Sequence, residues 1–256
     1  MIKADTRSVD LMRTSYGEIK QHKYDLAILP WGATEPHNYH LPYSTDYYLS
    51  QSIALDAALK AEQDGGIKCM VLPPVPYGSQ NIGQWQLPFC LHTRYETQKA
   101  ILTDIVSSLH RQGFSKLVIV NGHGGNSFKN MIRDLGYDYP DFLIAVSDWY
   151  AFVPEKEYFE EQGEHAGEQE TSVLMYYYPE LVDMPSAGDG NNIPFAVDEL
   201  NRKTAWIPRN WSRVTKDTGI GNPFRSTAEK GKRYAEEVVK RLSTLFVELV
   251  KKEDIY

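Results

Sequence analysis

The sequence predicts an α/β fold, a three-layer α/β/α sandwich built on a mainly parallel sheet. Two observations lead to this prediction. Short apolar runs alternate along the chain with longer amphipathic segments, which is the order of elements in βαβ units. The apolar runs are also continuous, as is typical of strands that are covered on both faces. Because we see no internal repeat or low-complexity linker, we expect residues 1–256 to form a single domain.

Two strands and two helices are expected in the first half of the chain. Residues 24–30 form an apolar strand, and residues 46–64 form a helix that a Gly-Gly pair stops. Residues 67–73 form a second strand that ends at a Pro-Pro pair. Residues 95–113 carry apolar side chains at helical spacing.

The second half of the chain predicts two further strands and three helices. Residues 115–120 and 142–147 are apolar runs of strand length, and residues 124–135 between them are expected to be helical. Residues 167–178 form a helix that stops before a proline. Residues 227–252 form a long amphipathic helix with a threonine as its N-cap.

The composition excludes several classes of protein. The formal net charge of −7 and the pI near 5.5 argue against nucleic-acid binding, which needs a basic surface. No apolar run approaches the roughly 18 residues of a membrane helix, and the N-terminus lacks the apolar core of a signal peptide. The two cysteines, Cys69 and Cys90, are too few for a disulfide scaffold. We therefore expect a cytoplasmic protein that binds neither membranes nor nucleic acids.

The fold also predicts where the chemistry should lie. Ligands of parallel sheets bind at the carboxyl ends of the strands, which here means just after residues 30, 73, 120 and 147. Residues 186–223 are rich in Gly, Asn, Pro and Trp, which favours long loops and a small hairpin.

The first chemical segment directly follows the first strand. Glu35, His37, His40 and Asp46 lie within twelve residues of one another. Imidazole and carboxylate groups are the ligand set of zinc, manganese or iron(II). Asp46 has an alternative interpretation, because a carboxylate is favoured at the start of a helix.

The second chemical segment, residues 121–126, follows the third strand. It holds His123 among three glycines, with Gly124 directly after the histidine. A phosphate-binding loop is one alternative, but the GxGxxG spacing and the P-loop lysine are both missing. A histidine held on a glycine turn at a strand end fits a metal ligand or an acid–base group better.

The third chemical segment runs from residue 164 into the next helix. Its acids Glu164 and Glu168 could be first-turn residues that interact favourably with the helix dipole. A cationic His165 at a helix start would oppose that dipole, which favours a neutral histidine able to act as acid or base.

These three segments resemble the motifs of the creatininase family. The family's first motif, Gly-x-x-Glu-x-His-x-x-His-Leu-Pro followed by Asp, is matched from Gly32 to Asp46. Its second motif, Asn-Gly-His-Gly-Gly-Asn, is complete at 121–126. Its third, His-Ala-Gly-x-x-Glu-Thr-Ser, is present at 165–172. The three matches occur in order over nearly the whole chain.

The resemblance implies an amidohydrolase with two divalent metal ions, zinc and/or manganese, with iron(II) as a further choice. By analogy, Glu35 and His123 would bind one ion, His37 the other, and Asp46 would bridge them. Creatininase has a further carboxylate two residues after the histidine of the second motif, where this chain has a glycine. Glu170 is the expected substitute, and Glu168 is the alternative.

The resemblance also implies roles for the groups around the metals. His165 would be the general acid that protonates the leaving nitrogen. His40 would orient a ligand or contact the substrate. Trp149, just past the fourth strand, is expected to wall the pocket, and Gly124 to lie beside the substrate.

The resemblance leaves the substrate open. Pro36, Asn38 and Tyr39 replace the Gln, Gly and Pro of the family core, and Pro88-Phe89-Cys90 replaces its Pro-Gly-Thr turn. Both changes add bulk near the expected pocket, so creatinine itself is in doubt. The expected substrate is a small amide or cyclic amide. Alternatives are hydrolysis of a formamide on a pyrimidine-type intermediate and peptide trimming of a cofactor precursor.

Two alternatives from other classes are a metal-binding protein without catalysis and a nucleotide-binding domain. The latter would need a glycine fingerprint that this chain lacks. The resemblance further suggests a homohexamer, and the 17 tyrosines favour some form of homo-oligomer, because tyrosine is enriched at interfaces.

Overall fold

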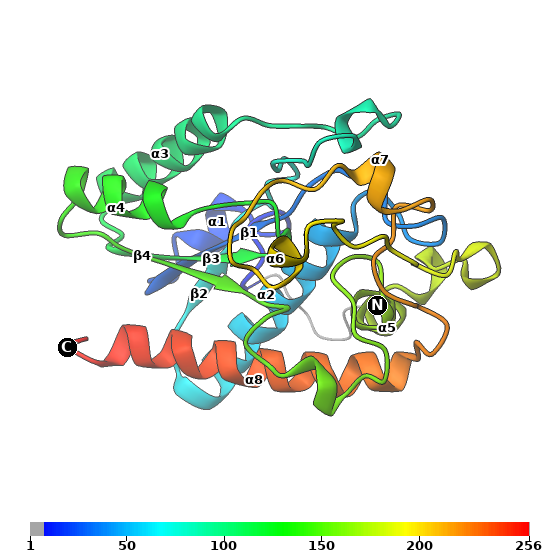
Figure 1. Cartoon of the computed structure of the whole chain (residues 1–256). Coiled ribbons are helices and arrows are strands. Elements are labelled where there is room, and N and C mark those ends of the chain that lie inside the picture. Colours follow the sequence, from blue (N-terminus) through cyan, green and yellow to red (C-terminus); the bar gives the residue numbers. More distant parts are fainter. Residues whose placement is uncertain (1–7, 256) are drawn as a thin grey trace.

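The computed structural model describes residues 8–255 and shows a parallel sheet between two layers of helices (Figure 1). The strands lie in the order β2-β1-β3-β4, and all neighbouring pairs are parallel. Their bounds are β1 Leu26–Trp31, β2 Cys69–Val71, β3 Lys116–Asn121 and β4 Leu143–Asp148. The predicted fold class and all four predicted strands are confirmed.

Five long helices surround the sheet, as predicted. They are α2 Thr45–Gly65, α3 Tyr95–Arg111, α4 Lys129–Asp138, α5 Glu168–Tyr177 and α8 Ala228–Lys251. The short helices are α1 Tyr16–Ile19, α6 Asp198–Asn201 and α7 Trp211–Val214, and there are 3-10 turns at Gln84–Gln86, Glu155–Glu157, Pro179–Leu181 and Met184–Ser186. None of the helices in residues 8–255 combines the length and apolar character needed to cross a membrane.

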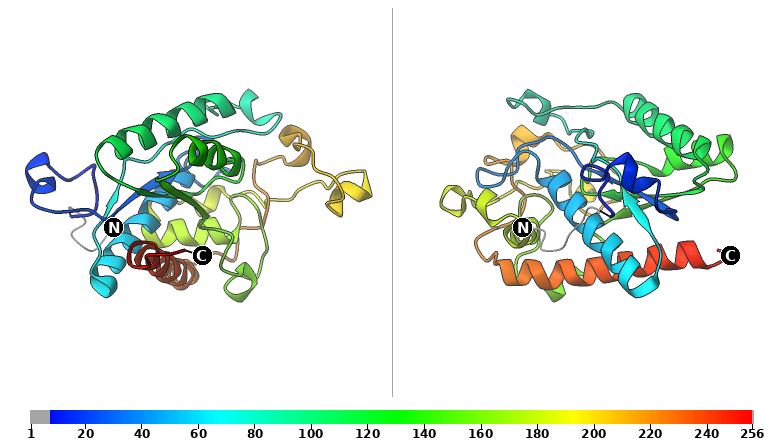
Figure 2. Two further views of the ribbon diagram at one scale, coloured as in Figure 1. Left: turned by 90° about the vertical axis from the view of Figure 1, so that its left-hand side faces the viewer. Right: turned by 180° about the vertical axis from the view of Figure 1, so that it is seen from behind.

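The two faces of the sheet pack against different helices (Figure 2). Along β1, Leu26 and Ile28 join the core with α2, α5 and α8, whereas Ala27, Leu29 and Trp31 pack with α3 and α4. This alternation follows from the pleat, because successive side chains of a strand point to opposite faces. Continuous apolar runs are therefore required, as the sequence predicted.

The strand order also fixes the position of a ligand crevice. From β1 the chain crosses to β2 on one side, and from β2 it crosses back to β3 on the other side of β1. β1 and β3 are therefore neighbours whose connections lead to opposite sides of the sheet, which is a topological switch point. The loops after β1 and β3 meet there.

Two element predictions are wrong. Residues 124–128 are not helical, because Asn126 closes a turn on His123 through its backbone N–H, and its side chain donates to the carbonyl of Gly32. Residues 186–223 form no hairpin. The backbone pairing there is limited to isolated bridges such as Asn192 with Thr215, and the segment around α6 projects from the body (Figure 2, left view).

Candidate metal centre and active site

Six side chains that can bind metals converge at the switch point: five that lie in two overlapping groups, and His165, which forms a group with Glu35 and His37. Glu35 and His37 lie in the loop after β1, and Asp46 lies in the first turn of α2. His123 follows β3, and Glu170 lies in the first turn of α5. Glu35, His37, Asp46 and His123 are more than nine-tenths buried, and Glu170 is partly buried. The cluster therefore joins two loops and the N-termini of two helices, from three segments that are far apart in the sequence.

The five side chains form two overlapping groups. Glu35, Asp46 and His123 offer three ligand atoms within 4.8 Å of one another, and so do His37, Asp46 and Glu170. Nε2 of His37 lies 2.8 Å from Oδ1 of Asp46, and Nδ1 of His123 lies 3.2 Å from Oδ2. Nδ1 of His123 is also 2.9 Å from Oε1 of Glu35. Asp46 thus faces both groups, one with each oxygen.

The outer nitrogen of each histidine is anchored on a backbone carbonyl. Nδ1 of His37 donates to the carbonyl of Glu35 at 3.0 Å, and Nε2 of His123 donates to that of Ser79 at 2.7 Å. A carbonyl can only accept, so the anchored nitrogen carries the proton. In the neutral rings the lone pair then points toward the carboxylates, which is the orientation that metal-binding histidines have.

This donor set fits divalent metal ions. It combines two oriented imidazoles with three carboxylates in a buried place, where so many acidic groups need a counter-charge. Oδ2 of Asp46 is buried and accepts no well-formed hydrogen bond, so it is free to face a cation. Glu35, His37, Asp46, His123 and Glu170 are therefore the side chains that could hold two ions.

The pKa values of the cluster show that its carboxylates favour positive charge beside them. Burial disfavours the imidazolium form of His37, but the charge and hydrogen bond of Asp46, together with the charges of Glu170 and Glu35, raise the pKa of His37 to about 10. Burial also opposes the charged form of His123, yet Glu35 raises its pKa well above the usual value. Burial would raise the pKa of Asp46, but the His37 charge lowers it. Protons thus occupy the positions that face the carboxylates.

The N-terminus of α2 decides between the two interpretations of Asp46. The N-cap is Ser44, two residues earlier, and the Asp46 carboxylate contacts His37 and His123 instead of capping the helix. Helix α2 therefore serves as the rigid support of this carboxylate.

Glu168 and Glu170 point to different parts of the molecule. Glu168 is fully buried, and its carboxylate contacts Nζ of Lys230 on α8 at 2.5 Å and two backbone N–H groups. Glu170 belongs to the group with His37 and Asp46 and accepts the N–H of Ala166. Burial raises the pKa of Glu170 above its usual value. The geometry thus favours Glu170 as the candidate ligand.

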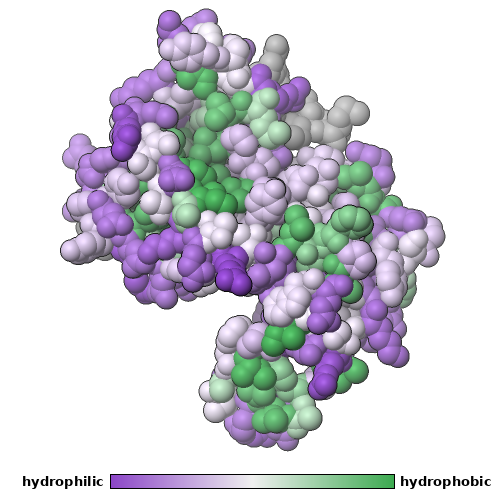
Figure 3. All heavy atoms as spheres, turned by 90° about the horizontal axis from the view of Figure 1, so that it is seen from above, coloured by the Kyte–Doolittle hydropathy of each residue, from purple (hydrophilic) through white to green (hydrophobic). Residues whose placement is uncertain are grey.

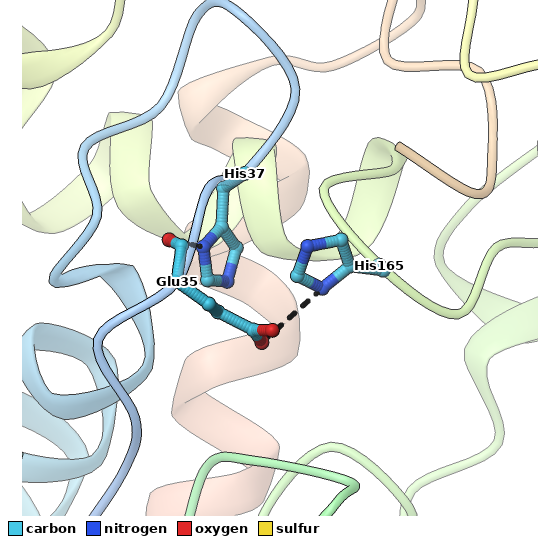
Figure 4. Close-up of side chains that lie close together, drawn as sticks. All are labelled: Glu35, His37 and His165. Carbon is cyan, nitrogen blue, oxygen red and sulfur yellow. Dashed lines mark hydrogen bonds and ion pairs between the residues drawn. The ribbon is translucent and has the colours of Figure 1, made fainter. Parts of the chain in front are cut away.

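His165 lies against the cluster (Figure 4). Its ring centroid is 4.2 Å from that of His37, and its Nδ1 is 3.7 Å from Oε1 of Glu35. Its Nε2 donates to the carbonyl of Pro36 at 2.9 Å, so Nδ1 faces the carboxylate. His165 does not start the helix as expected, because α5 begins at Glu168.

Two of the expected substrate contacts lie elsewhere. His40 is nearly inaccessible, and its Nε2 contacts the hydroxyl of Thr171 at 2.8 Å, so it supports α5 rather than reaching the cavity. Trp149 is completely buried in the core on the α2 and α8 face, so it does not wall the pocket. Gly124 lies in the cavity lining as expected.

A cavity of about 960 Å³ opens over the cluster. Its aromatic lining comes from Tyr150, Trp206 and Trp211. Arg209 at the rim pairs with Glu164 at 2.5 Å. A volume of this size is at the upper end for a small-molecule site.

Sequence reasoning missed three of the groups around the cluster. The carbonyl of Ser79 holds His123, Gln84 donates to Glu35 at 2.5 Å, and Trp211 packs edge-on against His165. The strand-end rule applied to residue 73 points toward the first two, because their segment follows β2. Nothing in the local sequence marks Trp211.

Known proteins resemble this chain over most of its length. A candidate creatinine amidohydrolase of Bacteroides fragilis NCTC 9343 is 57% identical, with a TM-score of 0.96 over 98% of this chain and 99% of its own. The creatinine amidohydrolase of Pseudomonas putida is 27% identical over 89% of this chain and 94% of its own. The mycofactocin precursor peptide peptidase of Mycolicibacterium smegmatis strain ATCC 700084 is 29% identical over 84% and 81%.

Solved creatininase structures share the fold at lower identity. A manganese form is 23% identical and a zinc–zinc form of a mutant 24% identical, with TM-scores of 0.76 and 0.78. Both alignments cover 96% of this chain. They span 100% of the manganese form and 99% of the zinc–zinc form. The creatininase family model, described as creatinine amidohydrolase, matches residues 12–246. This chain therefore belongs to the creatininase family of metal-dependent amidohydrolases, which act on C–N bonds.

Proposed function

We propose that this protein hydrolyses a C–N bond of a small amide or cyclic amide with two divalent ions, zinc and/or manganese, with iron(II) as a further choice. Glu35 and His123 would hold one ion, His37 and Glu170 the other, and Asp46 would bridge them. One observation carries the proposal. His37 and His123 are each anchored on a backbone carbonyl, and the other nitrogen of each ring faces a group of carboxylates. Asp46 belongs to both groups.

When bound, two divalent ions supply a nucleophilic water at neutral pH and polarise the scissile carbonyl. The side chains of the protein perform the other tasks. Nδ1 of His165 would accept the proton that the attacking water releases and pass it to the leaving nitrogen as the C–N bond breaks, because Nδ1 faces the cluster while Nε2 stays on Pro36. Tyr150 and Trp211 wall the cavity and limit the access of bulk water to the reacting bond.

A peptide is the second candidate substrate. The cavity of about 960 Å³ exceeds what a small cyclic amide needs, and one relative named above is a peptide peptidase. Another relative, from Thermotoga maritima strain ATCC 43589, is a 3-dehydro-scyllo-inosose hydrolase, so substrates differ among relatives that are 25 to 29% identical to this chain.

The test is a hydrolysis screen with metal-free protein reloaded with manganese, zinc or iron(II). The panel contains creatinine and related cyclic amides, formamides and short peptides. We expect turnover of one amide class that depends on added metal and is lost in His123→Ala. A protein that is fully loaded with metal yet inert on every class would favour the non-catalytic metal-binding alternative.

We further propose that the chain acts as a single catalytic domain in the cytoplasm and assembles into a homo-oligomer, with a hexamer as the expected form. The projecting segment around α6 shows hydrophobic side chains on its surface (Figure 3). Its exposed apolar side chains include Val197 and Trp206, the latter 82% exposed. Exposed apolar groups of this size favour a protein contact. Light scattering coupled to size exclusion should give a mass above the 29.2 kDa of one chain.

A further inference from the structure

A buried glutamine contacts Oε2 of Glu35, the carboxylate oxygen opposite the one that contacts His123. Gln84 lies in a 3-10 turn, Gln84–Gln86, and is 2% exposed. Its Nε2 donates to Oε2 of Glu35 at 2.5 Å. We propose that Gln84 is a positioning residue for the metal centre, one that fixes which oxygen of Glu35 faces the metals. This inference rests on the proposed function, because it assigns Glu35 to a metal.

The orientation of the Gln84 carboxamide is determined by its second contact. Its Oε1 accepts the backbone N–H of Asn81 at 2.8 Å. Because a backbone N–H can only donate, the oxygen must lie on that side, and the NH₂ group must face Glu35. The carboxamide is thus locked at both ends.

This contact separates the two oxygens of Glu35. Oε2 is occupied by Gln84, whereas Oε1 lies 2.9 Å from Nδ1 of His123 and 3.7 Å from Nδ1 of His165. Oε1 therefore remains as the oxygen that faces the cluster. A hydrogen bond to an ionised carboxylate in a buried site is stronger than one between neutral groups. Loss of this bond would let the carboxylate rotate and would leave Oε2 buried without its partner.

The turn that carries Gln84 is attached to the cavity wall. Ile82 accepts the N–H of Trp211 at 2.6 Å. Gly83 has φ +88, and a Cβ there would approach the Ser212 nitrogen to 2.8 Å. Trp211 in turn lines the cavity and packs 5.6 Å from His165. The support of Glu35 and the wall of the substrate cavity are therefore parts of one connected unit.

The test compares metal affinity in Gln84→Leu, Gln84→Glu and the matched control Gln86→Leu. Gln86 lies in the same turn with an exposed side chain. Affinity for Mn²⁺ and Zn²⁺ is measured by competition with a chelator, and folding of the metal-free protein by circular dichroism and thermal unfolding. Gln84→Leu should lower the affinity of one ion about 10- to 100-fold, as for other groups that orient metal ligands.

Gln84→Glu keeps the shape and the acceptor for Asn81 but turns an oxygen toward Glu35. It should therefore weaken binding at least as much as Gln84→Leu, while Gln86→Leu leaves the affinity unchanged. Unchanged metal affinity in Gln84→Leu and Gln84→Glu would overturn the inference, even if thermal stability fell, because that result indicates a purely structural residue. A wild-type protein that binds no divalent ion would contradict the proposed function instead.

Discussion

Glu168 and Glu170 stand two residues apart on α5, and their carboxylates serve different purposes. Glu170 faces His37 and Asp46, whereas Glu168 contacts Lys230 on α8. Glu170→Gln should therefore reduce the number of bound divalent ions from two to one, because an amide is a poor substitute for an anionic ligand. Metal analysis of protein dialysed against a slight excess of manganese measures this number.

Glu168→Gln is the matched control. It should retain both ions but lower the free energy of unfolding by about 1.5–3 kcal/mol, because a buried hydrogen bond to a charged group is weakened. Chemical denaturation of the metal-free protein measures this change. Loss of an ion in Glu168→Gln, with both ions kept in Glu170→Gln, would reverse the assignment.

His37 makes metal uptake depend on pH. Its pKa is raised to about 10, so the metal-free cluster carries a proton there at pH 7.5 that an ion must displace. Affinity for Mn²⁺ should therefore rise from pH 7 toward pH 10, by about tenfold per unit for each displaced proton. Calorimetry in two buffers of different ionisation enthalpy counts the released protons.

His40 provides the control for this titration. Burial lowers its pKa to about 4, so it is already neutral over this range and releases no proton. His40→Gln should leave the proton count unchanged. An affinity for Mn²⁺ that is independent of pH in the wild type would contradict the assignment of His37 as a ligand.

At the level of elements, α5 and α8 approach closely at a glycine. A Cβ at Gly231 on α8 would lie 1.9 Å from the carbonyl oxygen of Ser172 on α5. Gly231→Ala should destabilise the protein by about 1–3 kcal/mol, as overpacking does, although alanine is the better helix former. Gly136→Ala on α4 is the control, because a Cβ there meets nothing within 4 Å.

The control change should stabilise the fold by about 0.5–1 kcal/mol, since glycine is unfavourable inside a helix. Urea unfolding of both variants tests the pair. Equal effects at the two glycines would show that the α5–α8 contact is looser than described. Because α5 carries Glu170, a shift at this contact should also weaken metal binding.

The elements that could be predicted are those whose signal is local. Continuous apolar runs identified all four strands, and the Gly-Gly pair at 65–66 marked the end of α2, with Gly66 as the C-cap at φ +64. A glycine turn around His123 was predicted, but the delay of the following helix to Lys129 was not, because the turn also depends on Gly32 and Ser79, which are distant in the sequence. The face of the sheet toward which a side chain points also depends on distant parts of the chain. This is why the sequence predicted Trp149 in the pocket wall, whereas it lies in the core.

At the scale of the whole molecule, the switch point between β1 and β3 explains why the site could be anticipated at all. Their positions after strand ends and their residue types predicted that Glu35, Asp46 and His123 lie close together. The structure places them within one group of candidate ligands. Gln84 could not be found this way, because its contact with Glu35 spans 49 residues without a sequence signal. Substrate identity depends on the cavity lining, to which the projecting segment contributes Trp206.

The most direct measurement is the number of divalent ions bound per chain by the wild type and by Asp46→Ala. Asp46 is shared by both groups, so its removal affects both ions at once. We expect two ions per wild-type chain, metal-dependent amide hydrolysis, and loss of both ions with the activity in a folded Asp46→Ala protein. Two ions and full activity retained by that variant would contradict this expectation.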